Sequence, residues 1–434
     1  MDEKKIIYQV LPRLWGDGKM PSWDKESFDY LRLLGTDYIW MTGIPRHSSG
    51  KSFVKGCPGS PYAISDWYDI NPYLALDEDH RMEEFEALVA RVHSAGLKLI
   101  IDYVPNHVGR DYEGGLPLYD WNDADWTDTL KVNWSDPATE DEFVRVLNFW
   151  AQKGVDGFRC DMVELVPAES LANVITRVKL SFPNLLFVAE VYKRENYKTY
   201  IESVGFDLLY DKSGVYDTLR GVISGVRSAR ELSWNWQFLG GLQGHMLNFL
   251  ENHDEQRIAS PAFAGTVDKA WAAVAYAMLF NAASWMIYAG QEVGETASES
   301  ADGRTSIFNW SHPEGLSRIS EFVRCGSGLS EKEMDILARY RRLSTLAHSP
   351  LFRQGNVWDL CYCNLESPGF DPDRNTVFVR FDGNDAMVVL CNFSSFAIST
   401  DIVIPPELRE IAKLEKTEAS LYAPAYGYSL LKLK

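Results

Sequence analysis

The first part of the chain, up to about Ser349, alternates short apolar runs with amphipathic segments. Short, continuous apolar runs are typical of parallel strands buried on both faces. We expect such strands at residues 6–11, 38–42, 97–102, 155–160, 185–189, 206–209, 246–250 and 285–288. The segments between them carry apolar residues three and four positions apart, as a helix requires. We expect helices at residues 25–34, 81–94, directly after Asp136-Pro137, and at 168–180, 194–203, 215–224, 266–281 and 331–346.

Eight strand–helix units are the number that a closed (β/α)8 barrel needs, so the pattern predicts an α/β fold with a TIM barrel. One connection in this pattern is overlong. Residues 103–135, 33 in all, follow the third strand and are rich in Gly, Asp, Trp and Tyr. Loops of this length are uncommon unless they are functional, and this one emerges on the face where barrel active sites lie.

A different pattern begins after Ser349. Residues 376–381, 386–391 and 400–404 alternate with a period of two, and residues 428–433 offer a further strand. The sequence Asp382-Gly383-Asn384-Asp385 is a hairpin turn signal between the first two. We therefore predict two domains, a catalytic barrel at 1–348 that includes the excursion 103–135, and a C-terminal antiparallel β-sandwich at 349–434.

Composition and charge exclude several function classes. The 434 residues carry a net charge of −18 and have no Lys/Arg run, which argues against binding to nucleic acid or to an anionic membrane surface. The longest apolar stretches fall short of the roughly 20 residues that a membrane span needs. The first residues lack the apolar core of a signal peptide, and six cysteines are too sparse for a disulfide scaffold. We expect a cytoplasmic location, unless a leader has been removed, and leave the oligomeric state open.

Carboxylates recur where the expected strands end. Asp102 follows the third strand, Asp161 the fourth, Glu190 the fifth and Asp254 the seventh. Ionisable residues at these ends of barrel strands are typically catalytic. A single one is as easily a helix cap, but four together favour an active site. Two histidines, His107 and His253, stand close to Asp102 and Asp254 in the sequence.

The neighbours of two carboxylates predict different roles for them. Arg159 lies two residues before Asp161 on the same strand, so both side chains point to the same side. We expect the guanidinium to hold the pKa of Asp161 down and keep it ionised, as a nucleophile requires. Glu190 follows an apolar strand, so we expect desolvation to raise its pKa, as a general acid requires. Two carboxyl groups in opposite protonation states are typical of glycoside hydrolysis, and Asp254 supplies a third carboxylate to hold substrate hydroxyls.

Four segments of the chain resemble the conserved blocks of the α-amylase family, glycoside hydrolase family 13. In chain order they are Asp102–His107, Gly157–Asp161, Ala189–Val191 and Asn252–Asp254. The segment Ser60–Ile70 resembles the one that carries the family's stacking tyrosine, here Tyr62. The barrel and the C-terminal sandwich also fit, so the resemblance covers essentially the whole chain.

The resemblance implies a retaining double displacement on α-glucosidic bonds, with starch-derived α-1,4-glucans or maltooligosaccharides as substrates. It makes Asp161 the nucleophile, Glu190 the acid/base and Asp254 the transition-state stabiliser. It also implies a set of substrate-binding residues: Tyr62, Asp102, His107, Arg159 and His253. Among these we expect Tyr62 to stack on the sugar at the cleavage point, and both histidines to hydrogen-bond its hydroxyls.

The sequence departs from the family pattern in ways that change the expected site. Glu164 and Leu165 stand where amylases of the family commonly have Lys-His, which adds negative charge near the leaving-group side. The excursion 103–135 is short for the family's domain B, so we expect an open cleft with Trp121, Trp126 and Trp134 as a compact aromatic platform. The excursion and the loop 17–19 are also short for calcium sites. We therefore expect no required cofactor or metal, with calcium candidates, if any, at Asn106, Asp120, Asp123, Asp125 and Asp128.

Three alternatives remain open. A glucanotransferase of the same family would pass the glucosyl group to a sugar hydroxyl instead of to water. A non-catalytic relative would bind sugars or partners, but such proteins typically lack a catalytic carboxylate, and all three are present here. A metal-dependent hydrolase would need convergent histidines, and His107 and His253 are not in an HExxH-like spacing.

Overall fold

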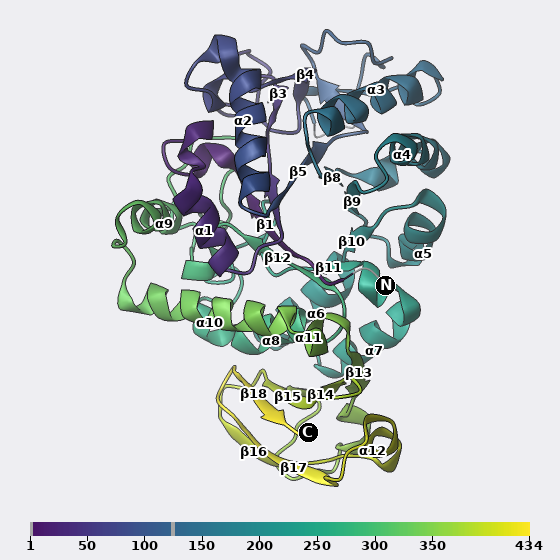
Figure 1. Cartoon of the computed structure of the whole chain (residues 1–434), viewed down its shortest axis with the longest axis vertical. Coiled ribbons are helices and arrows are strands. Elements are labelled where there is room, and N and C mark those ends of the chain that lie inside the picture. The colour runs from purple at the N-terminus through teal and green to yellow at the C-terminus, as the bar shows by residue number, and fades with distance from the viewer. Residues whose placement is uncertain (1–2, 123–125) are drawn as a thin grey trace.

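The computed structural model describes residues 3–122 and 126–434, and its central feature is a closed parallel barrel of eight strands (Figure 1). In chain order the strands are β1 (Ile6–Val10), β2 (Tyr38–Met41), β5 (Lys98–Tyr103), β8 (Gly157–Cys160), β9 (Leu186–Ala189), β10 (Leu208–Tyr210), β11 (Met246–Asn248) and β12 (Ser284–Tyr288). Pairing of β1 with both β2 and β12 closes the ring. The predicted barrel is confirmed, with strand ends that differ from the expected ones by at most two or three residues.

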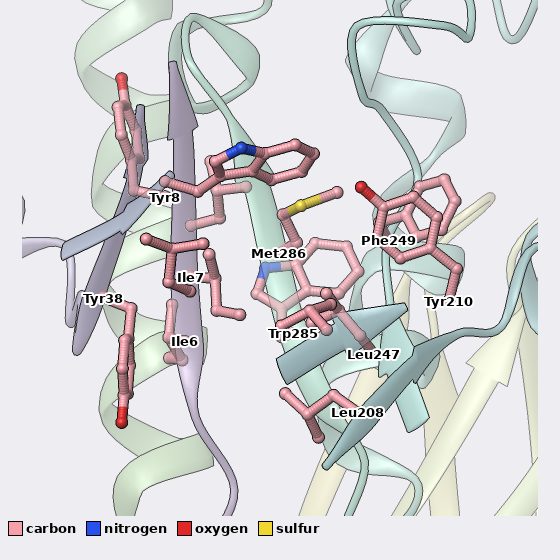
Figure 2. Close-up of a cluster of buried hydrophobic side chains, with 14 of the residues drawn as sticks. Ile6, Ile7, Tyr8, Tyr38, Leu208, Tyr210, Leu247, Phe249, Trp285 and Met286 are labelled. Atoms are coloured by element: carbon pink, nitrogen blue, oxygen red, sulfur yellow. The ribbon is translucent and has the colours of Figure 1, made fainter. Parts of the chain in front are cut away.

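The barrel strands are mostly apolar because both of their faces are buried, and polar residues such as Asp102 and Arg159 lie toward their carboxyl ends. All residues of β1 and β12 are buried, and Ile6 pairs with Trp285 and Ile7 with Met286. Figure 2 shows these side chains clustered with those of β10 and β11, including Leu247. This packing fixes the barrel, so the residues that follow each strand are held at defined places on its rim.

Helices cover the outside of the barrel (Figure 1). The longer ones are α1 (Lys25–Leu33), α2 (Arg81–Ser94), α3 (Ala138–Gln152), α4 (Ala168–Ser181), α6 (Asp217–Ser224), α7 (Arg230–Leu239), α8 (Trp271–Leu279), α9 (Glu314–Cys325) and α10 (Glu331–His348). Helices α7 and α9 were not predicted. The helix predicted at 194–203 is instead a chain of short turns, among them the three-residue α5 (Tyr197–Thr199), followed by a π-helical turn that Gly205 ends at φ +92°. No helix in the described part of the chain is both long and apolar enough to cross a membrane.

Two small antiparallel sheets stand above the carboxyl ends of the barrel strands. After β2, strand β3 (Pro45–His47) pairs with β4 (Ile64–Ile70). The predicted excursion after β5 contains the second pair, β6 (His107–Gly109) with β7 (Thr129–Lys131). The hairpin after β2 was not predicted, because β4 reads Ile-Ser-Asp-Trp-Tyr-Asp-Ile and is buried every third residue rather than every second.

The C-terminal part is antiparallel, as predicted, and lies at one end of the molecule beyond α8 and α11 (Pro350–Gln354) (Figure 1). One sheet has the order β13 (Asn356–Asp359), β14 (Asn375–Phe381), β15 (Ala386–Asn392), β18 (Tyr428–Lys432); the other pairs β16 (Ile398–Val403) with β17 (Glu418–Ala423). Helix α12 (Pro406–Ala412) connects the last two. Here the backbone N–H of Asp382 donates to Asp385 O in the predicted turn between β14 and β15. A separate apolar cluster lies within residues 360–433. The proposed boundary at 348/349 stays a prediction.

Candidate active site

The residues after neighbouring barrel strands converge on one cavity of about 230 Å³. Because β5, β8 and β9 are adjacent in the barrel, the side chains that follow them meet at the same part of the rim. The cavity brings together six of the residues singled out in the sequence: Tyr62, His107, Asp161, Glu190, His253 and Asp254. The other two, Asp102 and Arg159, lie behind it and are 1% and 0% exposed. The prediction that these two residues bind substrate stays untested, because neither of them lines the cavity.

Arg159 bridges the two carboxyl groups that were predicted as nucleophile and acid. Its Nη1 lies 2.6 Å from Asp161 Oδ1, and its Nη2 lies 2.9 Å from Glu190 Oε2. A third acid, Asp102, is 3.9 Å from Nη1. The guanidinium thus compensates buried negative charge and keeps the carboxyl groups of Asp161 and Glu190 close together.

The expected lowering of the Asp161 pKa is wrong. Arg159 does act in that direction, but burial outweighs it, so the pKa of Asp161 is raised. Burial also raises the pKa of Glu190, as predicted, and the negative charge of Asp161 raises it further. The interaction with Glu190 in turn lowers the pKa of Asp161. Both carboxyl groups therefore have a raised pKa, and the predicted roles of Asp161 as nucleophile and Glu190 as acid stay predictions.

Glu190 is held by hydrogen bonds at both of its oxygens. The backbone N–H of Met162 donates to Oε2 at 2.9 Å, and the Tyr192 hydroxyl donates to Oε1 at 2.5 Å. Met162 directly follows Asp161 and has a left-handed backbone, with φ +43°. This conformation is costly for a residue other than glycine. Here it turns the amide toward Glu190.

Tyr62 and His253 form a stacked, hydrogen-bonded pair on one wall of the cavity. Their ring centroids are 5.2 Å apart, and the Tyr62 hydroxyl lies 2.6 Å from His253 Nε2. The amide of Gln9 lies 2.6 Å from Nδ1 on the other side of the imidazole. Behind them Asp102 accepts from Trp40 Nε1 at 3.2 Å and from the Tyr62 hydroxyl at 3.4 Å. Burial lowers the pKa of His253, so the imidazole is neutral.

Asp254 stands on the same rim, next to His253. Its Oδ2 lies 3.1 Å from His253 Nε2, and its side chain is 39% exposed. Burial of the carboxyl group and the negative charge of nearby Glu190 raise the pKa of Asp254. A third carboxyl group that lines the cavity and is open to it can accept hydrogen bonds from substrate hydroxyls.

The excursion after β5 contributes His107 and Trp126, whose rings lie 4.9 Å apart and which both line the cavity. The expected platform of three tryptophans is wrong. Trp134 stacks on Phe143 of α3 and donates to Pro105 O, so it anchors the excursion to the barrel. Trp121 is 50% exposed and packs against Tyr119 outside the cavity.

The calcium candidates are dispersed where the structure describes them. Asp128 lines the cavity and lies 3.6 Å from Lys55 Nζ. Asp123 and Asp125 lie outside the described residues. Within residues 3–122 and 126–434, no three His, Cys, Asp or Glu side chains gather closely enough to hold a metal ion.

Sequence reasoning missed several residues that line the cavity, chiefly Lys55, Tyr192, Ile307 and Phe308. The last two come from the segment after β12, which carries no motif that we identified. Tyr192 had a usable signal, because it lies two residues after Glu190 in the sequence.

Known proteins are similar to this chain in sequence and in fold. The α-amylase catalytic-domain model matches residues 25–116. α-Amylase 3 of Dictyoglomus thermophilum is 25% identical over 338 residues, and α-amylase MalA of Haloarcula japonica is 26% identical over 429 residues. By these matches the chain is similar to the α-amylase family. Its fold is also that of a crystal structure of an α-amylase from Lactobacillus plantarum, with a TM-score of 0.74 at 20% identity, covering 99% of this chain and 98% of that one.

Both matches leave a large part of the relative uncovered. The Dictyoglomus match covers 66% of this chain and 62% of the relative, and the Haloarcula match covers 91% and 56%. The chain therefore spans less than two thirds of these relatives.

Proposed function

We propose that this α-amylase-family protein is a retaining glycoside hydrolase that cleaves α-1,4-glucosidic bonds of starch-derived glucans or maltooligosaccharides. One observation carries the proposal: a single buried guanidinium, Arg159, lies within 2.9 Å of both Asp161 and Glu190 at the base of a cavity. Retaining enzymes need their two carboxyl groups close together, about 5–5.5 Å, whereas inverting enzymes leave room for a water between them. A shared guanidinium favours the closer arrangement.

The proposed reaction has two steps. Asp161 attacks the anomeric carbon and forms a covalent glucosyl-enzyme, while Glu190 gives its proton to the leaving oxygen. In the second step, Glu190 takes a proton from a water molecule while the water oxygen attacks the anomeric carbon. The bond between the sugar and Asp161 breaks, so the sugar is released and Asp161 is regenerated. Asp254 accepts hydrogen bonds from sugar hydroxyls, and Tyr62 supports the ring. His107 and the neutral His253 are placed to hydrogen-bond the same sugar. The steps call for no metal ion or cofactor.

Digestion of soluble starch, pullulan, maltotriose and isomaltose, with products resolved by chromatography, tests the substrate. We expect shorter maltooligosaccharides from starch and none from isomaltose. Activity should survive dialysis against EDTA. Early products followed by proton NMR should have the α configuration. A first product of β configuration would contradict the retaining mechanism. Oligomers longer than maltotriose, formed from maltotriose itself, would instead identify a glucanotransferase.

A further inference from the structure

The hydroxyl group of Tyr192 makes a close contact with the proposed acid/base. It donates to Glu190 Oε1 at 2.5 Å, while Glu190 Oε2 accepts from the Met162 amide and faces Arg159. Tyr192 also lines the cavity. Because Oε2 accepts from the Met162 amide and forms the ion pair with Arg159, Oε1 is the oxygen left to carry the proton that is transferred. Tyr192 is therefore in contact with the oxygen on which the proposed chemistry depends.

Glu164 fixes the backbone that carries this tyrosine. Its carboxylate accepts from the Tyr192 backbone N–H at 2.8 Å, from Lys193 N–H at 3.2 Å and from Asn196 Nδ2 at 2.7 Å. On the other side of the peptide, Ser213 Oγ donates to Tyr192 O at 2.7 Å. The oxygens of Glu164 are used inside the loop after β9 and do not line the cavity, and its expected negative charge near the leaving-group side stays a prediction.

We propose that Tyr192 is a positioning residue for Glu190, and that Glu164 locks Tyr192 in place. The proposal rests on the function proposed above. A carboxyl group on a flexible side chain donates its proton efficiently only when one oxygen is held at the leaving group. The Tyr192 hydroxyl holds the Glu190 carboxyl group, and Glu164 holds the backbone of Tyr192. The restraint on Glu190 therefore comes from two segments of the rim.

The restraint has an electrostatic consequence. A hydroxyl that donates to Glu190 favours the ionised form, so Tyr192 lowers the pKa of Glu190 against the effect of burial. Other charged or titratable groups also interact electrostatically with Glu190. They are Arg159 and Asp161 from β8 and its end, Asp254 after β11, and the Tyr210 hydroxyl from β10. Removing the hydroxyl of Tyr192 leaves all of these in place.

The test is Tyr192→Phe, which deletes the hydroxyl and keeps the ring. We expect the Glu190 pKa to rise by about one unit, since a hydrogen bond to a charged group has about that effect. Titration of ¹³C-carboxyl-labelled glutamates by NMR measures this directly, and Glu190→Gln identifies the signal. The basic limb of the kcat/KM profile should move upward with it. Tyr68→Phe is the matched control, because the Tyr68 hydroxyl donates to Glu142 Oε1 at 2.9 Å outside the cavity.

The contribution of Glu164 to the position of Tyr192 is tested by Glu164→Ala, alone and combined with Tyr192→Phe. Alone, it should shift the Glu190 titration in the same direction by a smaller amount. In the Tyr192→Phe background it should add no further shift, because its effect passes through the hydroxyl. Glu84→Ala is the control, since Glu84 accepts from the backbone N–H groups of Leu76 and Asp77 in another loop.

An unchanged Glu190 titration in folded Tyr192→Phe would overturn the proposal. So would a rise in KM with no change in the titration, because that result describes a tyrosine that only contacts sugar. The NMR titration does not depend on turnover. If the wild-type protein cleaves no glucan but the titration still shifts, the proposed function fails while the positioning of Glu190 stands.

Discussion

Arg159 is a fully buried cation that faces the carboxyl groups of Asp161, Glu190 and Asp102. Burying a charge is costly unless it is paired, and the pairing here gives each acid a different balance of burial and attraction. Burial raises the pKa of both Asp161 and Glu190, and Arg159 acts against burial at each of them. At the scale of single residues, the proposed double displacement needs Asp161 ionised while Glu190 is protonated.

Replacing either proposed catalytic acid should abolish most activity and leave the fold intact. We expect Asp161→Asn and Glu190→Gln each to lower kcat/KM on maltooligosaccharides by at least about 10²-fold, since each loses a nucleophile or a proton donor. Asp141→Asn, at an exposed ion pair with Arg177, is the control and should retain activity. Circular dichroism checks the fold. Near wild-type turnover by Glu190→Gln on an unactivated glucan would rule out its role.

The pH profile should reflect two raised pKa values. Activity needs Asp161 ionised and Glu190 protonated. Burial raises the pKa of both, so activity should be lost on the acidic side at a pH above the ordinary range of an aspartate, about 4. The basic limb lies higher still, because the Asp161 charge raises the pKa of Glu190. Measuring kcat/KM between pH 3 and 10 checks this. An acidic limb at the ordinary aspartate value would show that burial does not dominate at Asp161.

At the scale of elements, the sequence predicts the barrel and the catalytic rim well. Buried parallel strands are continuous apolar runs, and each of Asp102, Asp161, Glu190 and Asp254 lies at or shortly after the end of such a run. Their placement follows from the barrel alone. The role of Arg159 as a bridge to Glu190 needs the packing of β8 against β9, which no local pattern contains.

The positions of side chains in the loops are harder to predict, because contacts between distant segments decide them. Trp126 and Trp134 lie eight residues apart in one excursion, yet one lines the cavity and the other packs on α3. The hairpin β3–β4 was missed because β4 is buried every third residue rather than every second. Helix α7 buries residues at helical spacing, but the exposed aromatic residues Trp234 and Phe238 obscure that pattern in the sequence. Where contacts between distant segments decide a position, as for Lys55 and Asp128, sequence periodicity carries no information.

Two tryptophans of the excursion, Trp126 and Trp121, should differ in their effect on substrate binding. Trp126 lines the cavity beside His107, whereas Trp121 faces outward. We expect Trp126→Ala to raise KM for maltooligosaccharides several-fold, as loss of an aromatic contact of about 1 kcal/mol would. Trp121→Ala is the matched control and should leave KM unchanged. Equal effects of the two variants on KM would show that the excursion contacts sugar along its whole length.

At the scale of the whole molecule, one side chain ties the C-terminal sheet to the barrel. Arg380 of β14 is fully buried and donates to five backbone carbonyls: Leu279, Asn281, Leu351, Gly355 and Asn356. We expect Arg380→Leu to lower the free energy of unfolding by about 2–4 kcal/mol, because these acceptors lose their donor.

Denaturant unfolding followed by fluorescence measures the effect of Arg380→Leu. The control is Arg177→Leu, which removes an exposed ion pair with Asp141 and should change stability by at most about 0.5 kcal/mol. If Arg380→Leu is as stable as the control, the carbonyls find water or new partners, and the anchor is weaker than its contacts suggest.

The size of the cavity sets the expected dependence on substrate length. At about 230 Å³ it is smaller than the roughly 300–1,000 Å³ that encloses a typical small ligand. The short excursion after β5 supplies little further wall, and only a few sugar units can make contacts. Energy from remote sugars is what raises the rate on the reacting bond in a long-chain enzyme. We therefore expect kcat/KM to rise over the first few glucose units and then level off.

A series of maltooligosaccharides of increasing length measures this dependence, with initial rates at substrate concentrations well below KM. The Trp126→Ala variant also tests how many sugar units contact the protein. If the contact serves a sugar next to the cleavage point, its loss should lower kcat/KM by the same factor for every substrate longer than the first few units. A kcat/KM that continues to climb with each added glucose would show an extended row of subsites. The cleft would then reach beyond the cavity, along the surface between the two small sheets.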